Sequence, residues 1–466
     1  MRRKQSLPMA PTFMVSAPGK VIVFGEHAAV YGKPAIAAAI SLRSYLLVNT
    51  LSKSCHTVTL NMRDIGLAHT WDIAALPWTV FNQPEKKKSF HSHVTSLDDD
   101  LLDTIIPYAE EVSKHLPQQD RKIHISSAKA FLYLFLSLSS PHSPAVIYTL
   151  RSTIPVRAGL GSSASVCVCL SAALLLQIRA LAGPHPDQPP EEAELQIERI
   201  NRWAYVGEMC IQGNPSGVDN TVSAGGKAVL YQRQRQGAAG SSSTPLVTPL
   251  PRFPKLPLLL VNTRQGRSSL TQVENVSVLR RNHPKVVEPI LEGIGEVCNS
   301  ALELISSTDF DGGDNGSMSA AVEHLGTLIR INHGFLVSLG VSHPRLERIR
   351  ELVDYAGIGW TKLTGAGGGG CAITLFRPDV EEETIRELEQ KFEAEGFEKY
   401  ETVLGADGVG VLWPAVFRNE DDDRAAEEVD REMFEKAEGP QGIDRLVGVG
   451  AQENRKGWKF WTRMAV

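Results

Sequence analysis

The sequence predicts a protein of fold class α+β with two domains, and three observations support this prediction. Segments typical of strands alternate with segments typical of helices up to about Tyr231. A biased stretch at 232–244 (QRQRQGAAGSSST) then interrupts the pattern as a linker would. Beyond it, a strand at 256–262 precedes helices near 268–281, 284–306, 317–338 and 344–356, then glycine-rich turns, strands and a helix near 380–395. Amphipathic helices on one side of an antiparallel sheet would make the second domain α+β.

These changes of pattern divide the chain into four segments. We expect an N-terminal mixed α/β domain, a low-complexity insert or linker, a C-terminal α+β domain and a C-terminal extension, at residues 1–231, 232–250, 251–414 and 415–466. The acidic run at 420–432 (EDDDRAAEEVDRE) in the extension predicts an exposed helix, and 457–461 (GWKFW) is aromatic. The sequence leaves open whether the extension packs onto the rest of the protein, bridges subunits or stays partly disordered.

The composition excludes several classes of protein. With 466 residues, 42% of them hydrophobic, the chain can bury large cores. A net charge of −5 and a pI near 6.3 imply no nucleic-acid partner. No apolar run approaches a membrane span, and no uninterrupted apolar segment follows the basic N-terminus, so we expect no membrane attachment. The six cysteines form no C-x-x-C pair and several lie in apolar helices, which predicts buried, reduced thiols and a cytoplasmic protein.

The most informative segment is the phosphate loop, PVRAGLGSSAS at 155–165. It joins an apolar strand at 145–150 to an apolar helix at 164–181, so it lies at a helix N-terminus. Gly159 and Gly161 allow positive φ and close approach of a ligand, while free amide groups and the helix dipole favour a polyphosphate. The hydroxyls of Ser162 and Ser163 could cap the helix or bind Mg²⁺.

Other interpretations of this loop exist. It could be an ordinary turn, and GLGSSA also fits a dinucleotide-binding fingerprint, as does the glycine-rich segment 365–370. A dinucleotide fold should place an acidic residue about 20 residues further on, where this chain is rich in proline. The Walker A sequence and the H-R-D and D-F-G elements of protein kinases are absent from the sequence.

Three charged residues complete a candidate site. Lys20 follows a Pro-Gly corner and precedes an apolar run, which predicts a fixed cation at the edge of a strand. Glu208 and Asp219 are 11 residues apart, and Asn214-Pro215 should break the helix between them. Asn214 would then cap a new helix with Pro215 in its first turn, so the two carboxylates come from different elements and can converge.

Two further segments join the phosphate loop in a pattern. PGKVIVFGEHAAVYGKP at 18–34 and KLTGAGGGGCA at 362–372, together with that loop, resemble the signatures of the small-molecule kinase superfamily named for galactokinase, homoserine kinase, mevalonate kinase and phosphomevalonate kinase. GEHAAVYG at 25–32 and GNPSGVDN at 213–220 resemble the mevalonate kinase branch, whereas galactokinases are expected to carry EHTDY at the first position. The resemblance extends from about Phe13 to Trp413.

The resemblance implies a fold, a reaction and partners. The C-terminal domain would be ferredoxin-like, with the active site in the cleft between the domains. The reaction would be phosphorylation of the 5-hydroxyl of (R)-mevalonate by ATP with Mg²⁺, an early step of isoprenoid and sterol biosynthesis. A homodimer and inhibition by isoprenoid diphosphates that compete for the ATP site are implied as well. The alternatives are another kinase of the superfamily, such as phosphomevalonate kinase, which should carry more basic residues for its substrate, and a non-catalytic ligand sensor, which should lack the base or the metal carboxylate.

The resemblance also implies roles for individual residues. Asp219 would be the base and Lys20 would stabilise charge, while Ser163 and Glu208 would bind Mg²⁺. The nucleotide would contact Lys20, Asp64, Ser152, Arg157, Ala158, Gly159, Leu160, Gly161, Ser162 and Ser163. The mevalonate pocket would contain Glu26, His27, Arg267 and Ser269, and a closing turn would contain Gly365, Gly367, Gly368 and Gly369.

This chain departs from the family pattern at several of these positions. Asp64 replaces the usual Asn, Ser269 the usual Thr, and Arg157 the usual Gly, so that Arg157 could add a cation at the phosphates or point to solvent. The glycine turn could alternatively serve only as a tight connection between strands.

Overall fold

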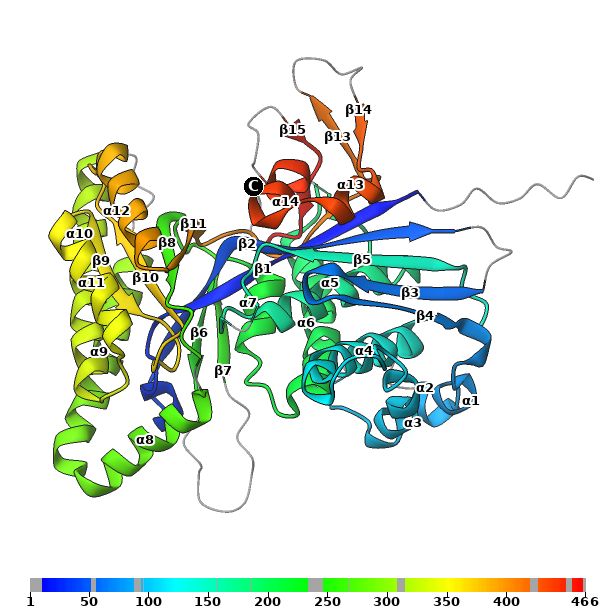
Figure 1. Ribbon diagram of the computed structural model, residues 1–466, viewed down its shortest axis with the longest axis horizontal. Helices are drawn as coiled ribbons and strands as arrows, with labels where there is room; N and C mark the ends of the chain where they lie inside the picture. Colours follow the sequence, from blue (N-terminus) through cyan, green and yellow to red (C-terminus); the bar gives the residue numbers. More distant parts are fainter. Residues whose placement is uncertain are drawn as a thin grey trace, which may run out of the picture.

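A long antiparallel pair of strands, β1 (Phe13–Phe24) and β2 (Ala35–Thr50), forms the centre of the N-terminal domain (Figure 1). The computed structural model describes residues 11–51, 56–87, 94, 96–156, 158–185, 187–233, 246–266, 268–307, 315–419, 426–449 and 455–463. Both strands are long and mainly apolar, and they are buried along most of their length.

The N-terminal sheet grows outward from this pair. β5 (Val146–Ser152) pairs with the second half of β2 and confirms the apolar strand expected at 145–150. The remaining strands of this sheet are β3 (Thr57–Met62), β4 (Leu67–Asp72), β6 (Ala228–Gln232), β7 (Leu246–Leu250), β12 (Gly410–Leu412) and β16 (Lys459–Phe460). β6 and β7 form a hairpin, so both ends of the expected insert belong to the sheet, and 234–245 between them lie outside the described residues.

Helices cover one face of this sheet (Figure 1). They are α3 (Asp99–Ala109), α4 (Gln118–Leu138), α5 (Ser162–Gln177), α6 (Pro190–Gln212) and α7 (Val218–Gly225), with the shorter α1 (Trp78–Phe81), α2 (Pro84–Lys87), η2 (Arg63–Ile65) and η3 (Ile73–Ala75) at the edges. The short η1 (Ala28–Tyr31) instead packs in the core of the C-terminal domain. Because α5 lies between the sheet and α4 and α6, it is apolar around its whole circumference.

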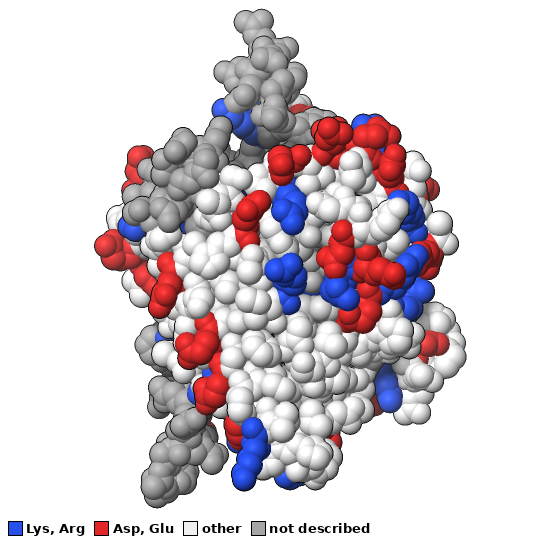
Figure 2. Space-filling model, turned by 90° about the vertical axis from the view of Figure 1, so that its left-hand side faces the viewer, with Lys and Arg blue, Asp and Glu red and all other residues white. Residues whose placement is uncertain are grey.

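The C-terminal domain is the ferredoxin-like α+β unit that the sequence predicts. Its antiparallel strands are β8 (Leu256–Asn262), β9 (Gly359–Leu363), β10 (Cys371–Phe376) and β11 (Glu398–Leu404), in the order β11-β8-β10-β9. Its helices are α8 (Ser269–Asn282), α9 (Pro284–Ser306), α10 (Asn315–Ser338), α11 (Pro344–Ala356) and α12 (Glu382–Ala394), each within a few residues of the expected bounds. Acidic and basic side chains are interspersed on the outer face of this domain (Figure 2), where α11 and α12 share pairs such as Arg348 with Glu395.

The two domains share one continuous sheet and part of one core. β11 joins β2 through the pair Leu404 and Ile40. Val21 and Ile36 from the N-terminal domain pack in the same cluster as Leu258 and Ile373 from the C-terminal sheet. This shared packing fixes the base of the cleft between the domains.

The C-terminal extension covers the second face of the N-terminal sheet (Figure 1). It contains β13 (Val416–Asn419), β14 (Ala426–Glu428), β15 (Arg455–Lys456), α13 (Arg431–Lys436) and α14 (Gly439–Val447). The prediction of one acidic helix over 420–432 is wrong for its described part, because 426–428 pair with β13 and the helix begins only at Arg431. Residues 420–425 lie outside the described residues. The acidic side chains at 427 and 428 can be exposed in a strand as well as in a helix, so the charge pattern alone could not distinguish a strand from a helix here.

Of the helices in the described parts of the chain, none combines the length and the apolar character needed to cross a bilayer.

A partly buried carboxyl in the extension predicts that its docking depends on pH. Tyr45 donates a hydrogen bond to Asp444 of α14 at 3.2 Å, and burial raises the pKa of Asp444 to about 6, above its ordinary value of 3.8. A raised pKa means that the folded state favours the protonated acid. Wild-type stability should therefore fall as the pH rises from about 4 through 6. At pH 8 the variant Asp444→Asn should be more stable than wild type by on the order of 1 kcal/mol, with little difference at pH 4.

Thermal melting of both proteins across this pH range measures the effect. The exposed Asp103→Asn is the matched control, since its carboxyl lies in solvent on α3. A loss of stability in Asp444→Asn at pH 8 would contradict this account.

Candidate active site

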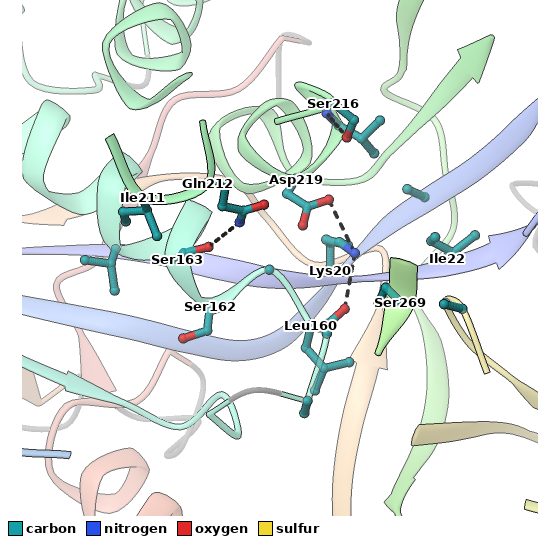
Figure 3. Close-up of a pocket in the computed structure, with 18 of the residues that line it drawn as sticks. Lys20, Ile22, Leu160, Ser162, Ser163, Ile211, Gln212, Ser216, Asp219 and Ser269 are labelled. Atoms are coloured by element: carbon teal, nitrogen blue, oxygen red, sulfur yellow. Dashed lines mark hydrogen bonds and ion pairs between the residues drawn. The ribbon is translucent and has the colours of Figure 1, made fainter. Parts of the chain in front are cut away.

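A cavity of about 720 Å³ lies between the domains. Figure 3 shows that β1, the phosphate loop and α7 meet around it, and that Ser269 reaches it from the start of α8. The predicted site residues that line the cavity are Lys20, Glu26, His27, Ala158, Gly159, Leu160, Gly161, Ser162, Ser163, Asp219, Ser269 and Gly365. The predicted site residues that the structure describes but that do not line the cavity are Asp64, Ser152, Glu208, Gly367, Gly368 and Gly369. Arg157 and Arg267 lie outside the described residues.

The phosphate loop packs directly against β1. The Lys20 amide donates to Leu160 O at 2.9 Å, and Ser165 of α5 donates to Ala17 O at 2.6 Å. Gly161 has φ 72° and precedes α5, where an added Cβ would lie 3.0 Å from Lys20 Cγ, so only glycine suits this position. The helix starts at Ser162, two residues earlier than expected, and the amides of its first turn are therefore available to a ligand.

An ion pair joins β1 to α7, and its lysine also contacts the phosphate loop. Lys20 Nζ lies 3.3 Å from Asp219 Oδ1 and donates to Gly159 O at 3.2 Å (Figure 3). β1 continues through the Pro18-Gly19 corner, which forms an irregularity in the β1–β2 pairing. Lys20 therefore lies within β1 and not at a strand edge. The expectation of an edge position was wrong, whereas the expectation of a fixed cation agrees with the two contacts of the ammonium.

The helix that carries Asp219 starts later than expected. α7 begins at Val218 after Gly217, whose φ of 79° turns the chain, and Asn214 is not its cap. Asn214-Pro215 is typical of a helix start, but Gly217, which lies closer to α7 and has a left-handed backbone conformation, determines where the helix begins. Asp219 thus lies in the first turn, and Ser223 attaches α7 to β1 by donating to Pro18 O at 2.7 Å.

A second carboxyl lies behind the phosphate loop. Ser163 donates to Glu208 Oε1 at 2.6 Å. Gln212 donates to Ser163 Oγ at 3.0 Å, a bond that Figure 3 shows. Burial, with the nearby Asp219 charge, raises the pKa of Glu208 to about 7. Sequence reasoning missed Gln212, although its position one helical turn after Glu208 places both on one face of α6. The oxygen atoms of Ser163 and Glu208 are of the kind that hard divalent cations prefer.

Glu26 belongs to a buried network between the domains. Its carboxylate accepts hydrogen bonds from Lys362 of β9 and, at 3.1 Å, from Asn332 of α10, and the Glu26 and Lys362 side chains are fully buried. His27 Nε2 lies 3.0 Å from Ala366 O, and burial lowers the pKa of His27, so the neutral ring donates to this carbonyl. Sequence reasoning missed Lys362 and Asn332, since neither carries a local signal for a partner more than 300 residues away.

The glycine turn connects β9 to β10 and also closes one side of the cavity. Gly365 and Ala366 line the cavity. Gly368 donates its amide to Val341 O at 2.8 Å and lies behind the cavity wall. Both functions weighed from the sequence, a strand connection and a wall of the site, are thus compatible.

Asp64 and Ser152 lie together beside the cavity wall. Asp64 Oδ2 accepts from the Ser152 amide at 2.7 Å, and Asp64 Oδ1 accepts from Arg151 Nε at 2.9 Å. Their contact with a nucleotide stays a prediction, because the adjacent Met62 and Ile65 line the cavity instead.

Comparison with known proteins agrees with this geometry. Residues 126–227 match the model of the GHMP kinases N terminal domain, and 318–394 match that of GHMP kinases C terminal. A mevalonate kinase of Aspergillus fumigatus is 67% identical over 463 residues, 99% of this chain and 84% of the relative. A mevalonate kinase of Gibberella zeae is 61% identical over 464 residues, 99% of this chain and 90% of the relative. The chain belongs to the mevalonate kinase family.

A solved structure supports the fold independently. The crystal structure of L. major mevalonate kinase in complex with R-mevalonate matches with a TM-score of 0.58 at 20% identity, over 87% of this chain and 100% of that one. The two-domain α+β kinase fold is thus confirmed.

Membership of the mevalonate kinase family makes the chain an ATP-binding transferase of isoprenoid biosynthesis. A phosphomevalonate kinase is not favoured, because the relatives at 61% and 67% identity are mevalonate kinases. A non-catalytic sensor is not favoured either, since Lys20, Ser163, Glu208 and Asp219 are all present and lie close together.

The Glu26–Lys362 pair should contribute strongly to stability. Lys362→Met leaves the Glu26 carboxylate buried without its cation, and we expect a loss of about 3 to 5 kcal/mol in the free energy of unfolding. The double variant Glu26→Gln, Lys362→Met removes both charges and should recover much of this loss. Urea denaturation followed by fluorescence measures it.

A surface pair provides the control. Lys33 pairs with Glu292, whose side chain is 55% exposed, so Lys33→Met should cost less than about 1 kcal/mol. Equal stability of Lys362→Met and Lys33→Met would refute the importance of burial for the first pair.

Proposed function

We propose that the chain transfers the γ-phosphoryl group of ATP to the 5-hydroxyl of (R)-mevalonate, giving 5-phosphomevalonate and ADP, in the cavity between the domains. Phosphorylation of mevalonate is the activity of its family. The observation that carries the detailed proposal is the Lys20–Asp219 ion pair beside a helix N-terminus. This arrangement offers a proton acceptor, a cation and phosphate-binding amides within one cavity.

In the proposed reaction Asp219 accepts the proton of the mevalonate hydroxyl. The hydroxyl oxygen forms a bond to the γ-phosphorus, the bond from phosphorus to the β–γ bridging oxygen breaks, and its electrons leave with ADP. Lys20 supplies positive charge where the γ-phosphoryl oxygens gain negative charge, and the amides at the start of α5 bind the phosphates. Because the transition state is loose, positioning and charge stabilisation account for most of the rate.

We propose Mg²⁺ as the metal, bound through Ser163 and Glu208. The site fits this ion, since both side chains offer oxygen atoms and Gln212 orients them through hydrogen bonds at 3.0 and 3.3 Å. Held there, the ion would supply positive charge against the phosphates of ATP. Its binding requires an ionised Glu208, whose raised pKa lies near 7.

The cavity has two sides with different chemistry. Met62, Ile65 and Ile123, with Ser126 and Ser127 of α4, line the side near α4, which we assign to the nucleoside. We assign the other side to mevalonate; it includes Glu26, His27, Tyr231, Ser269 and Gly365. The structure of the L. major relative with R-mevalonate supports this substrate.

The remaining partners follow the same reasoning. An isoprenoid diphosphate would compete with ATP, because its diphosphate suits the amides of the phosphate loop and its chain suits the apolar wall near α4. We also propose a homodimer, on the strength of the family resemblance. A cytoplasmic location is supported by the five described cysteines, which are buried and form no disulfide within the described structure.

Replacing the base tests the proposal directly. Asp219→Asn should lower kcat with mevalonate by about 10²- to 10⁴-fold while KM changes little, because the change removes proton acceptance. A coupled assay of ADP release measures it, with mevalonate, phosphomevalonate, galactose and homoserine as acceptors. Wild type should turn over mevalonate strongly. Near-normal kcat in Asp219→Asn would rule out its role as base, and Asp103→Asn serves as the exposed control.

Metal titration tests the second carboxyl. Glu208→Gln keeps an acceptor for Ser163 but loses the charge, so half-maximal activity should need at least about tenfold more Mg²⁺. The titration is run at saturating ATP and mevalonate. An unchanged Mg²⁺ requirement would remove Glu208 from the metal site.

A further inference from the structure

A single arginine joins the C-terminal extension to the wall of the cavity. Arg151 of β5 is 4% exposed, and its Nε donates to Asp64 Oδ1 at 2.9 Å. The rest of its guanidinium donates to three carbonyls at the end of α13: Phe434 O and Glu435 O, both at 2.9 Å, and Ala437 O at 2.8 Å.

This geometry suits arginine in particular. The last carbonyls of a helix have no partner within that helix, and they lie at the negative end of its dipole. The planar guanidinium can donate to several of them and to a carboxylate at once, which a lysine ammonium cannot do over the same span. Arg151 therefore fixes α13 and Asp64 relative to each other.

Asp64 in turn holds a segment that lines the cavity. It lies in the short turn η2, between Met62 and Ile65, which both line the cavity on the side assigned to the nucleoside. The turn has other attachments, since Asp64 Oδ2 accepts from the Ser152 amide at 2.7 Å and His124 Nε2 lies 2.7 Å from Ile65 O. Of these three attachments, only the one through Arg151 depends on the extension.

We propose that the C-terminal extension contributes to nucleotide binding. Arg151 is the positioning residue through which docked α13 holds the cavity wall at Met62 and Ile65 in place. The inference rests on the assignment of this wall to the nucleoside under the proposed function. It gives the extension a role in ATP affinity although, in the described structure, none of its residues lines the cavity.

Arg151→Lys tests the proposal. The variant keeps a positive charge but loses the planar guanidinium, so η2 should lose its connection to α13 while the bonds to Ser152 and His124 remain. KM for ATP, and Kd for ATP by calorimetry, should rise about tenfold, while KM for mevalonate and kcat at saturating ATP stay within about twofold of wild type.

A second variant weakens α13 without changing Arg151 itself. Asp430 caps α13 by accepting from the Met433 amide at 2.8 Å, and Asp430→Ala should loosen the helix without touching β5. It should raise KM and Kd for ATP about two- to fivefold, and again leave mevalonate unaffected. If Arg151→Lys fails to fold, Asp430→Ala tests the role of the extension by itself.

Arg43→Lys is the matched control. Arg43 is another buried arginine of the same sheet, but its guanidinium donates to Ser16 and to the carbonyls of Asp407 and Gly408, away from η2. It should lower the melting temperature as Arg151→Lys does, without a selective rise in KM for ATP.

The outcomes separate this proposal from the proposed function. Unchanged Kd for ATP in folded Arg151→Lys or Asp430→Ala, or an equal change in Arg43→Lys, would overturn the role of Arg151. If the wild-type protein binds ATP but does not phosphorylate mevalonate, the proposed function fails, and the comparison of Kd values still tests the role of Arg151.

Discussion

The docking of the phosphate loop on β1 is the constraint on which the rest of the site depends. Lys20 takes part with both its backbone and its side chain, since its amide binds Leu160 O and its ammonium lies 3.3 Å from Asp219. One strand residue thus sets the distance between the phosphate-binding amides and the carboxylate. α5 and α7 are attached to the adjacent carbonyls of β1 through Ser165 and Ser223. The site is therefore built on a central strand and not on mobile loops, which favours fixed geometry.

The same strand pair explains why an extension is needed. Successive residues of a strand face opposite sides of the sheet, and β1 and β2 are apolar on both. Val15 and Leu46 face the helices, whereas Met14, Tyr45 and Leu47 face the extension. Without cover on the second face, these side chains would be exposed to water at a cost of about 2 kcal/mol for each large one.

Local sequence was enough to predict the parts of the site that local chemistry determines. The phosphate loop, Lys20 and the helices of the C-terminal domain all carry signals within a few residues, and the structure has them close to the expected positions. The start of α7 and the strand β14 were mispredicted because a glycine and a pairing partner outweighed capping and charge pattern. Lys362 and Arg151 could not be assigned at all, since their partners are 336 and 283 to 286 residues away.

The continuous sheet limits how the cavity can adapt to a ligand. Rotating one domain against the other would break the pairing of Leu404 with Ile40 and expose the core that both domains share. Adjustment must then come from the segments at the rim: the phosphate loop, the glycine turn and η2. The first is fixed to β1, and the second is held by Val341 O and His27. The third is attached to α4 through His124, to β5 through the Ser152 amide and to the extension through Arg151, so the extension is connected to a rim segment that is not fixed to β1.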